Sequence, residues 1–194
     1  MTASAQAIAY AKLAAQVYTD PPQVGAVNGA ARARMYGNVL AFRGTDDVAT
    51  WLADLEIDTV FVAGLGVVHE GFWRALYGVL PDLRKLPTPE VIVGHSEGAA
   101  LATIYAGVLC MQGWHSVQVY GFEPPRLCGN GVLRQTLDDD GIQRFYTSNG
   151  SDPVPLVPPE LSLPGELTQI GSPRGPIPLI ADHYIDNVIR SLEA

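Results

Sequence analysis

The 194-residue sequence is poor in basic residues, in cysteine and in long hydrophobic runs. Its 12 Lys and Arg are outnumbered by 20 Asp and Glu, and the net charge of −8 argues against a nucleic-acid partner, because phosphate binding requires clustered cations. No run reaches the roughly 18 apolar residues of a membrane span. Two cysteines, Cys110 and Cys128, are too few for a disulfide framework, so we expect buried free thiols. Without a CxxC motif, an HExxH motif or a spaced His/Cys cluster, we expect no metal site and no cofactor.

The first 22 residues, MTASAQAIAYAKLAAQVYTDPP, are rich in alanine but lack a basic leading segment. Lys12 interrupts the apolar stretch that a signal peptide requires, so we interpret this segment as a helix. We therefore expect no signal peptide, and a protein that is either cytoplasmic or exported by a leaderless route.

Helical periodicity and short apolar runs alternate along the chain. Apolar residues make up 47% and charged residues 16%, which is typical of a globular protein. The pattern predicts helices near residues 3–18, 69–86, 98–111, 132–137 and 183–192, a short helix capped by Asp47, a hairpin over 34–42, strands at 91–94, 117–122 and 142–148, and at most short strands in the Pro-rich segment 153–178. This alternation predicts an α/β fold with a mostly parallel central sheet and helices on both faces, in a single domain over residues 1–194.

The stretch VIVGHSEGAALA, residues 91–102, places Ser96 between two glycines in a GxSxG pattern. The pattern alone is weak, and a simple turn residue is the alternative. However, an apolar strand directly precedes it and a helix directly follows it, which is the setting of a nucleophile elbow. Gly94 and Gly98 would let the strand and helix pass closely, and the helix N-terminus would direct N–H groups at an anion formed there. Ser96 is therefore a candidate nucleophile.

A nucleophilic serine needs a base, and hydrolases of this architecture order their triad as serine, acid, histidine. Two of the four histidines precede Ser96. His115 follows it, but the only carboxylate between them is adjacent to the serine. His183 alone leaves room for an intervening acid, and it is the candidate base by elimination. The alternative is a surface histidine at the start of a helix.

Several carboxylates could supply the acid of the triad. Asp152 is favoured because it follows an apolar strand, and catalytic side chains gather at strand ends in a parallel sheet. It would orient the imidazole and stabilise its charged form. Glu123, which follows the preceding strand, is the runner-up, and a turn aspartate before proline is the alternative for Asp152. The less favoured acids are Asp138, Asp139, Asp140, Glu160, Glu166 and Asp182.

Eight blocks of the sequence carry a family likeness: AKLAAQVY, AFRGTD, WLADL, VHEGF, GHSEGAALA, YGFEPPRL, SDPVPLVPP and DHY. In their order, and over most of the chain, they resemble the class 3, fungal-type triacylglycerol lipase family of α/β hydrolases. The resemblance implies a compact α/β-hydrolase fold. It also implies Ser96 as nucleophile, Asp152 as acid and His183 as base, in agreement with the elimination above.

The resemblance further implies an oxyanion hole and a lid. In the family, the residue after the RG of the AFRGTD block lines the hole, so the candidate donors are Thr45 and the backbone N–H of Glu97, each worth roughly 3 kcal/mol. Residues 46–51 would form a short lid whose two aspartates put interfacial activation in doubt. Asp54 and His69 also match the family and are expected to be structural. Candidate substrate contacts are Asp46, Val48 and Trp51 in the lid, and Val154, Leu156 and Val157 in the Pro-rich wall.

Glu97 departs from the family, which usually has an aliphatic residue at this position. A carboxylate aimed at the oxyanion would slow the reaction, because like charges repel strongly at short range. We therefore expect its side chain to point toward solvent, Arg126 or another polar partner, as a structural contact at the pocket rim. The alternative is a polar pocket that selects a cationic or hydrogen-bonding substrate.

These observations predict a serine carboxylic-ester hydrolase that acts on lipid or other acyl esters through an acyl-enzyme intermediate. Its partner would be the ester or lipid substrate, with no nucleic acid and no transmembrane segment. Two alternatives stay open: an acyltransferase, and a non-catalytic lipid- or partner-binding module on the same fold.

Overall fold

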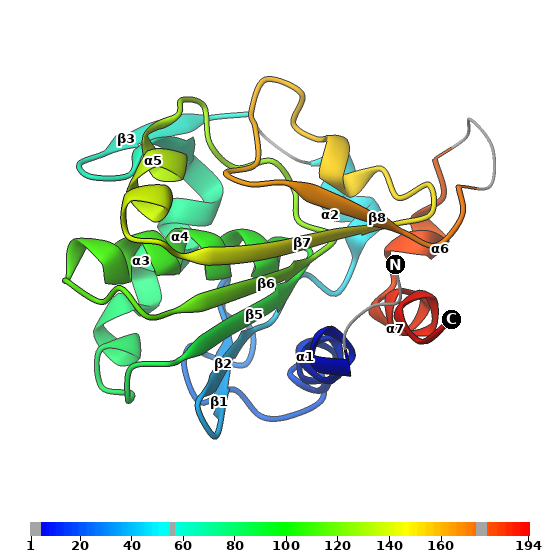
Figure 1. Ribbon diagram of the computed structural model, residues 1–194, viewed down its shortest axis with the longest axis horizontal. Helices are drawn as coiled ribbons and strands as arrows, with labels where there is room; N and C mark the ends of the chain where they lie inside the picture. The colour runs from blue at the N-terminus through cyan, green and yellow to red at the C-terminus, as the bar shows by residue number, and fades with distance from the viewer. Residues whose placement is uncertain (1–4, 55–56, 174–177) are drawn as a thin grey trace.

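The structure is a computed structural model, and it describes residues 5–54, 57–173 and 178–194. Within these residues, six strands form one sheet in the order β1-β2-β5-β6-β7-β8 (Figure 1). The strands are β1 (Ala33–Tyr36), β2 (Val39–Phe42), β5 (Val91–His95), β6 (Gln118–Phe122), β7 (Gln143–Asn149) and β8 (Leu167–Ile170). β1 pairs with β2 as the antiparallel hairpin predicted over residues 34–42, and the other neighbouring pairs are parallel. The predicted mostly parallel sheet is confirmed.

Helices cover both faces of this sheet (Figure 1). On one face, α1 (Ala5–Gln16) and α7 (Ile185–Glu193) pack against each other and against the strands. The other face carries α3 (Glu70–Leu83), α4 (Glu97–Met111) and α5 (Val132–Asp139). Each layer buries its own hydrophobic cluster against the sheet, which is the three-layer arrangement expected for a parallel sheet.

Helix α4 lies at the centre of its layer, and all its side chains from Gly98 to Cys110 are buried. Small residues dominate its first turn, so the helix approaches the backbone of the sheet closely. Its N-terminus meets the carboxyl end of β5, and the carboxyl ends of β6 and β7 lie beside it. The residues that directly follow these three strands therefore come together at one edge of the sheet.

Two parts of the fold differ from the sequence-based expectation. β3 (Thr59–Val62) and β4 (Gly66–His69) form a separate antiparallel hairpin that was not predicted. Its strands have only four residues each, and Phe61 is largely exposed, so the apolar pattern of a buried strand is missing. The helix expected over 183–192 begins later, at Ile185 as α7, because the backbone of Tyr184 is extended, and the short α6 (Ile180–His183) that precedes it was not predicted.

Several local predictions are confirmed. The Asp47 side chain caps α2 (Val48–Ala53) by accepting a hydrogen bond from the Thr50 backbone N at 3.0 Å. Cys110 and Cys128 are buried free thiols. The N-terminal helix is observed from residue 5 onward, and residues 3–4 of the prediction lie outside the described residues. Across the ranges that the structure describes, none of the helices has the length and apolar character needed to cross a bilayer.

Candidate active site

Ser96 occupies the sharp turn between β5 and α4. Its backbone has φ 58° and ψ −132°, a conformation that is strained for a residue with a side chain. Hydrogen bonds hold the turn on both sides: the Ser96 backbone N donates to Phe122 O at 2.9 Å, and its carbonyl accepts from Ala99 N at 2.9 Å. The turn therefore has the backbone geometry of a nucleophile elbow.

Two glycines make this turn possible. A Cβ atom at Gly94 would collide with the backbone of Gly98, and one at Gly98 would collide with the Phe42 carbonyl of strand β2. Strand β5, helix α4 and strand β2 therefore approach one another more closely than side chains would permit. The close passage that the sequence predicts for Gly94 and Gly98 is confirmed.

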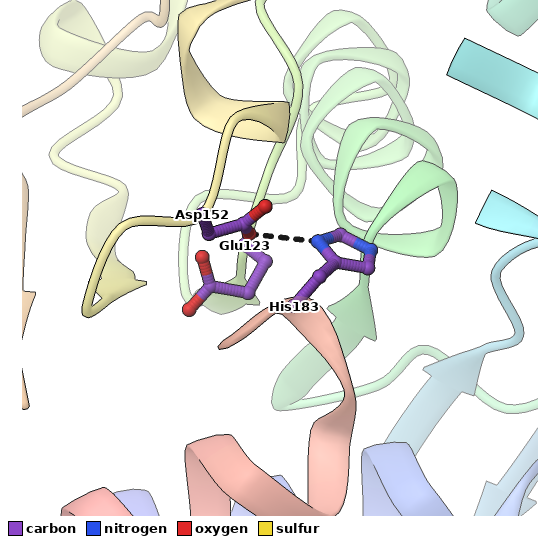
Figure 2. A group of neighbouring side chains, drawn as sticks. All are labelled: Glu123, Asp152 and His183. Carbon is purple, nitrogen blue, oxygen red and sulfur yellow. Dashed lines mark hydrogen bonds and ion pairs between the residues drawn. The ribbon is translucent and has the colours of Figure 1, made fainter. Parts of the chain in front are cut away.

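His183 and Asp152 come together although 31 positions separate them in the chain. His183 Nδ1 lies 2.7 Å from Asp152 Oδ2, and both side chains are fully buried (Figure 2). Asp152 lies in the loop after β7, and His183 ends the short helix α6. A bond of this length, between a ring N–H and a carboxylate, is in the range of charge-assisted hydrogen bonds.

The surroundings of Asp152 favour its charged form. Burial alone would raise the pKa of this carboxyl, but hydrogen bonding from His183 and contact with Glu123 outweigh that effect and lower its pKa. The backbone N of Val154 donates to the other oxygen, Asp152 Oδ1, at 3.0 Å. Asp152 is therefore an anion that fixes which nitrogen of the His183 ring carries the proton.

The loop that carries His183 is tied to the end of β7. Asp182 Oδ2 accepts from Ser151 N at 2.9 Å, and the Asp182 carbonyl accepts from Asn149 Nδ2 at 2.9 Å. Leu179 N donates to Ser151 O at 3.0 Å. These bonds fix the position of the segment that carries His183 relative to the loop that carries Asp152. Asp182 thus connects the segment of His183 to Asn149 and Ser151 at the end of β7.

His95 holds the backbone of His183 in place. His95 Nε2 lies 2.7 Å from the His183 carbonyl oxygen and donates to it, while the Tyr18 hydroxyl lies 2.9 Å from His95 Nδ1. Burial, and next the neighbouring His183, lower the pKa of His95 to about 3, so its ring is neutral. Because Nε2 carries the ring proton, Nδ1 accepts from Tyr18. Sequence analysis did not assign this role to either residue.

Ser96 Oγ and His183 Nε2 are the remaining polar atoms of the expected triad. Both are buried, and neither has a hydrogen-bond partner in the described part of the chain. The two rings of His95 and His183 lie 4.7 Å apart between centroids, so the His183 ring lies beside the residue that precedes the serine. The structure therefore joins Asp152 to His183 and leaves the hydroxyl of Ser96 unpaired.

A pocket of about 240 Å³ lies next to these residues. Thr45, the expected oxyanion residue, lines it together with Asp46, Val48 and His95. Tyr184 and Ile185 also line it. Asp46 forms ion pairs with Arg43 and Arg32, which hold the segment that follows Thr45. Thr45 thus borders an open space near the elbow.

The other expected substrate contacts are distributed over three environments. Trp51 stacks on Phe72, with centroids 6.3 Å apart, and packs against the core. Val154 is fully buried under the Asp152 loop. Leu156 is 56% exposed and lines a different pocket, together with Arg126 and Leu163, and Val157 is half-buried beside it. Of the six residues expected to contact substrate, the 240 Å³ pocket brings together Asp46 and Val48.

Comparison with known protein families shows to which family the chain belongs. The family model described as lipase (class 3) matches residues 39–162, well over half of the sequence. The chain belongs to the class 3 lipase family. The match spans the Thr45 turn, the Ser96 elbow and Asp152, whereas His183 lies beyond it.

Relatives in this lipase family share both sequence and fold. The secreted mono- and diacylglycerol lipase A of Penicillium cyclopium is 38% identical in an alignment of 135 positions, which covers 62% of this chain and 42% of the relative. The secreted mono- and diacylglycerol lipase 1 of Fusarium solani is 30% identical, over 62% of this chain and 39% of the relative. Lipase II from Rhizopus niveus has the same fold, with a TM-score of 0.70 at 19% identity over 95% of this chain and 97% of that structure. The chain thus spans less than half the length of the curated relatives it matches.

The expectation of a cytoplasmic or leaderless protein is wrong in the light of these class 3 relatives. Both fungal lipases are described by name as secreted. The argument from the composition of the first 22 residues therefore did not predict the compartment of the family's members.

Glu97 is half-buried in this class 3 chain, and its side chain lies within the electrostatic reach of Arg32 and Tyr18. Burial raises the pKa of Glu97 to about 7, and Arg32 partly offsets the effect. Arg126, one of the partners that the sequence suggested, instead donates to the carbonyls of Pro155 and Pro159 at 3.3 Å. The cation that lowers the pKa of Glu97 is therefore Arg32.

His69 and Asp54 have the structural roles expected for them. His69 is buried, stacks on Phe72 at 4.1 Å, and caps α3 by accepting from the Phe72 backbone N at 3.4 Å. Asp54 ends α2, and its backbone N donates to Thr50 O at 3.0 Å.

Glu123, the runner-up acid, is also part of the site. Glu123, Asp152 and His183 each present one potential ligand atom, and these atoms lie within 4.8 Å of one another. Such a group has the size of a cation site. However, His183 Nδ1 and Asp152 Oδ2 already satisfy each other, so the donor set fits a proton network better than a metal ion. The two acids that follow adjacent strands, and the histidine farther along the chain, could be read in the sequence, but the sequence did not show that the three side chains converge.

Proposed function

We propose that the chain is a serine carboxylic-ester hydrolase with Ser96 as nucleophile, His183 as base and Asp152 as acid. The observation that carries the proposal is the 2.7 Å bond between His183 Nδ1 and Asp152 Oδ2 beside a serine in the strained elbow conformation. Asp152 keeps the ring proton on Nδ1, so Nε2 is free to remove the proton of Ser96.

In the proposed reaction, Ser96 Oγ attacks the ester carbonyl carbon while Nε2 of His183 takes its proton. The tetrahedral oxyanion accepts hydrogen bonds from the backbone N–H groups of Thr45 and Glu97. The intermediate collapses to an acyl-enzyme, and the proton on Nε2 passes to the departing alcohol. Water, deprotonated by His183, then releases the acid and restores the serine.

For the substrate class, we propose the acyl esters of glycerolipids. Relatives described as mono- and diacylglycerol lipases support this class. The pocket of about 240 Å³ beside Thr45 lies below the roughly 300–1,000 Å³ that is usual for ligand pockets, which favours small acyl groups.

The test is hydrolysis of soluble p-nitrophenyl esters, combined with labelling by a fluorophosphonate probe. Wild type is expected to hydrolyse the esters and to be labelled, whereas Ser96→Ala is expected to lose both properties, with kcat/KM lower by about 10⁴ or more. Ser116→Ala is the matched control, because Ser116 is exposed and precedes β6, at the opposite end of the strands from the site. Folded wild type that is neither active nor labelled would overturn the proposal.

A further inference from the structure

Glu123 is buried in a position that a charged side chain rarely occupies. It follows β6 directly, its side chain has no exposed surface, and its φ of 53° is positive. The backbone N of Glu123 donates to Thr147 O at 2.9 Å, so the strained conformation is fixed by pairing with β7. The side chain is thereby turned inward and lies beside that of Asp152 (Figure 2).

The carboxyl of Glu123 lacks the partners that an anion requires. Neither oxygen has a hydrogen-bond partner of ordinary geometry among the described residues. Asp152, in contrast, accepts from His183 Nδ1 at 2.7 Å and from Val154 N at 3.0 Å. Two carboxylates this close cannot both ionise in a buried site, so one of them keeps a proton. The available donors assign the charge to Asp152 and the proton to Glu123.

We propose that Glu123 is a neutral carboxylic acid at neutral pH whose O–H group faces Asp152, and that it is a positioning residue for the proposed triad. In this arrangement Asp152 is held from two sides, by the His183 ring N–H and by the acid of Glu123. The proposal rests on the proposed function for its catalytic consequence, although the protonation of Glu123 stands on geometry alone.

The electrostatic surroundings agree with this assignment. Burial raises the pKa of Glu123 well above its ordinary value, the neighbouring Asp152 raises it further, and Asp182 adds to the effect. The Asn149 backbone acts in the opposite direction without outweighing them. His183 also presents a ring nitrogen within 4.8 Å of the Glu123 carboxyl. Asp152 shows the converse effect, because its pKa is lowered despite burial.

The kinetic test compares Glu123→Gln with Glu123→Gly through the pH dependence of kcat/KM on a soluble ester. Glutamine keeps the shape and replaces the O–H donor with an N–H donor, whereas glycine removes the side chain and suits a positive φ. We expect the glycine variant to lose about tenfold in kcat with little change in KM, and glutamine to restore kcat to within about threefold of wild type. A glycine variant with the kcat of wild type would overturn the positioning role.

The acidic limb of the same profile reports the charge of Glu123. An ionised Glu123 would stabilise the imidazolium form of His183, so its replacement by glutamine would lower the midpoint of the limb, by about one pH unit. A neutral Glu123 predicts no such shift, and a drop of that size would overturn the assignment.

Dialysis against EDTA tests whether the cluster of Glu123, Asp152 and His183 holds a metal ion, and it is expected to leave the activity intact. Activity that is lost on dialysis and restored by a divalent cation would assign the cluster to a metal instead.

A readout that needs no activity separates this proposal from the proposed function. The infrared measurement uses Glu97→Gln as the reference in place of wild type, because the pKa of Glu97 is raised to about 7 and its own carboxyl would absorb at pH 7. The spectrum of this reference at pH 7 is expected to show the carbonyl band of a protonated carboxyl group, which disappears when Glu123→Gln is added. Glu160→Gln is the matched control, because Glu160 is exposed and the band should persist. If Ser96→Ala remained active while the band behaved as expected, the proposed function alone would fail. If the band were absent from the reference, the proton assignment would fail.

Discussion

His95 Nε2 donates a hydrogen bond of 2.7 Å to the backbone carbonyl of His183. Because His95 immediately precedes Ser96, the same turn carries the proposed nucleophile and the side chain that holds the segment of the proposed base. Tyr18, in the segment after α1, holds His95 in turn, so the segments of Tyr18, His95 and His183 meet next to the site. Loss of His95 should therefore displace His183 without removing any reacting group.

We predict that His95→Ala lowers kcat by about 10²-fold with a smaller change in KM, since a displacement of about 1 Å in a catalytic group has an effect of this size. It should also reduce the free energy of unfolding by about 2–4 kcal/mol, because it leaves a cavity and unpaired buried groups. Steady-state kinetics and chemical denaturation measure the two effects.

Tyr18→Phe is the matched control for His95→Ala. It removes the hydroxyl that serves His95 Nδ1 but leaves the bond from Nε2 to the His183 carbonyl. We expect a stability loss of about 1 kcal/mol and a kcat closer to wild type. Equal kcat losses in the two variants would show that the bond to His183 is not what maintains activity.

The strained backbone of Ser96 leads to a prediction about stability. Its φ of 58° is unfavourable for serine, whereas glycine adopts it freely. Ser96→Gly should therefore be inactive yet more stable by about 1 kcal/mol, after allowance for the entropy cost of glycine. Calorimetry should record a rise in Tm of about 2–4 °C for a domain of this size.

Ser96→Ala distinguishes relief of strain from loss of the hydroxyl. Alanine also removes the hydroxyl, but it retains a Cβ atom and therefore the backbone strain. We expect its Tm to stay near that of wild type. If Tm rose as much as in the glycine variant, the gain in stability would come from removal of the buried, unpaired hydroxyl and not from relief of backbone strain.

Much of the fold was predictable because strong local signals act within short stretches. The wholly apolar run at 91–94 and the small residues from Gly98 onward predict strand β5 and helix α4, and both are observed. Hairpin β3–β4 was missed because its exposed Phe61 and four-residue strands give no periodicity. The extended backbone of Tyr184 lies within a helical pattern, and no turn residue marks it in the sequence.

The candidate site was predictable to a different extent. Chain order and elimination led to His183, and a position after an apolar strand favoured Asp152 as the acid. The structure brings these two residues into contact. The carboxylates after two neighbouring strands could be read in the sequence as rival acids, but their sharing of one buried space depends on strand order and could not. The role of Tyr18 had no sequence signal, because its contact with His95 spans 77 positions.

The carboxyl group of Glu97 makes stability depend on pH. Burial raises its pKa from an ordinary 4.5 to about 7, so the folded state binds this proton more tightly than the unfolded state. The resulting destabilisation is absent below about pH 4.5, grows as the pH rises to about 7, and is constant above that value. Glu97→Gln should therefore raise Tm at pH 8 and have little effect at pH 4.

Glu160→Gln is the comparison for this experiment, because Glu160 is exposed. Thermal unfolding of both variants and wild type at pH 4, 6 and 8 should show a gain in Tm that increases with pH in the Glu97 variant alone. An equal gain at pH 4 and pH 8 would contradict the raised pKa and would instead indicate a packing effect of the amide.

Acyl-chain preference is the last property that the geometry predicts. The pocket beside Thr45 has a volume of about 240 Å³. Trp51, the large apolar residue of the expected lid, is half-buried, stacks on Phe72 and packs against the core. Helix α2 has only six residues, and most of its side chains are exposed or half-buried, so its opening would uncover little apolar surface. We therefore expect kcat/KM to be highest for p-nitrophenyl acetate and butyrate, to fall with longer chains, and to show no jump when a substrate exceeds its solubility.

Val48 lines this pocket, so Val48→Ala enlarges the pocket and should shift the optimum of kcat/KM toward longer acyl chains. Val132→Ala, at an exposed residue of the distant α5, is the control and should leave the optimum unchanged. A rate that rises abruptly above the solubility limit would mean that α2 opens onto an interface after all.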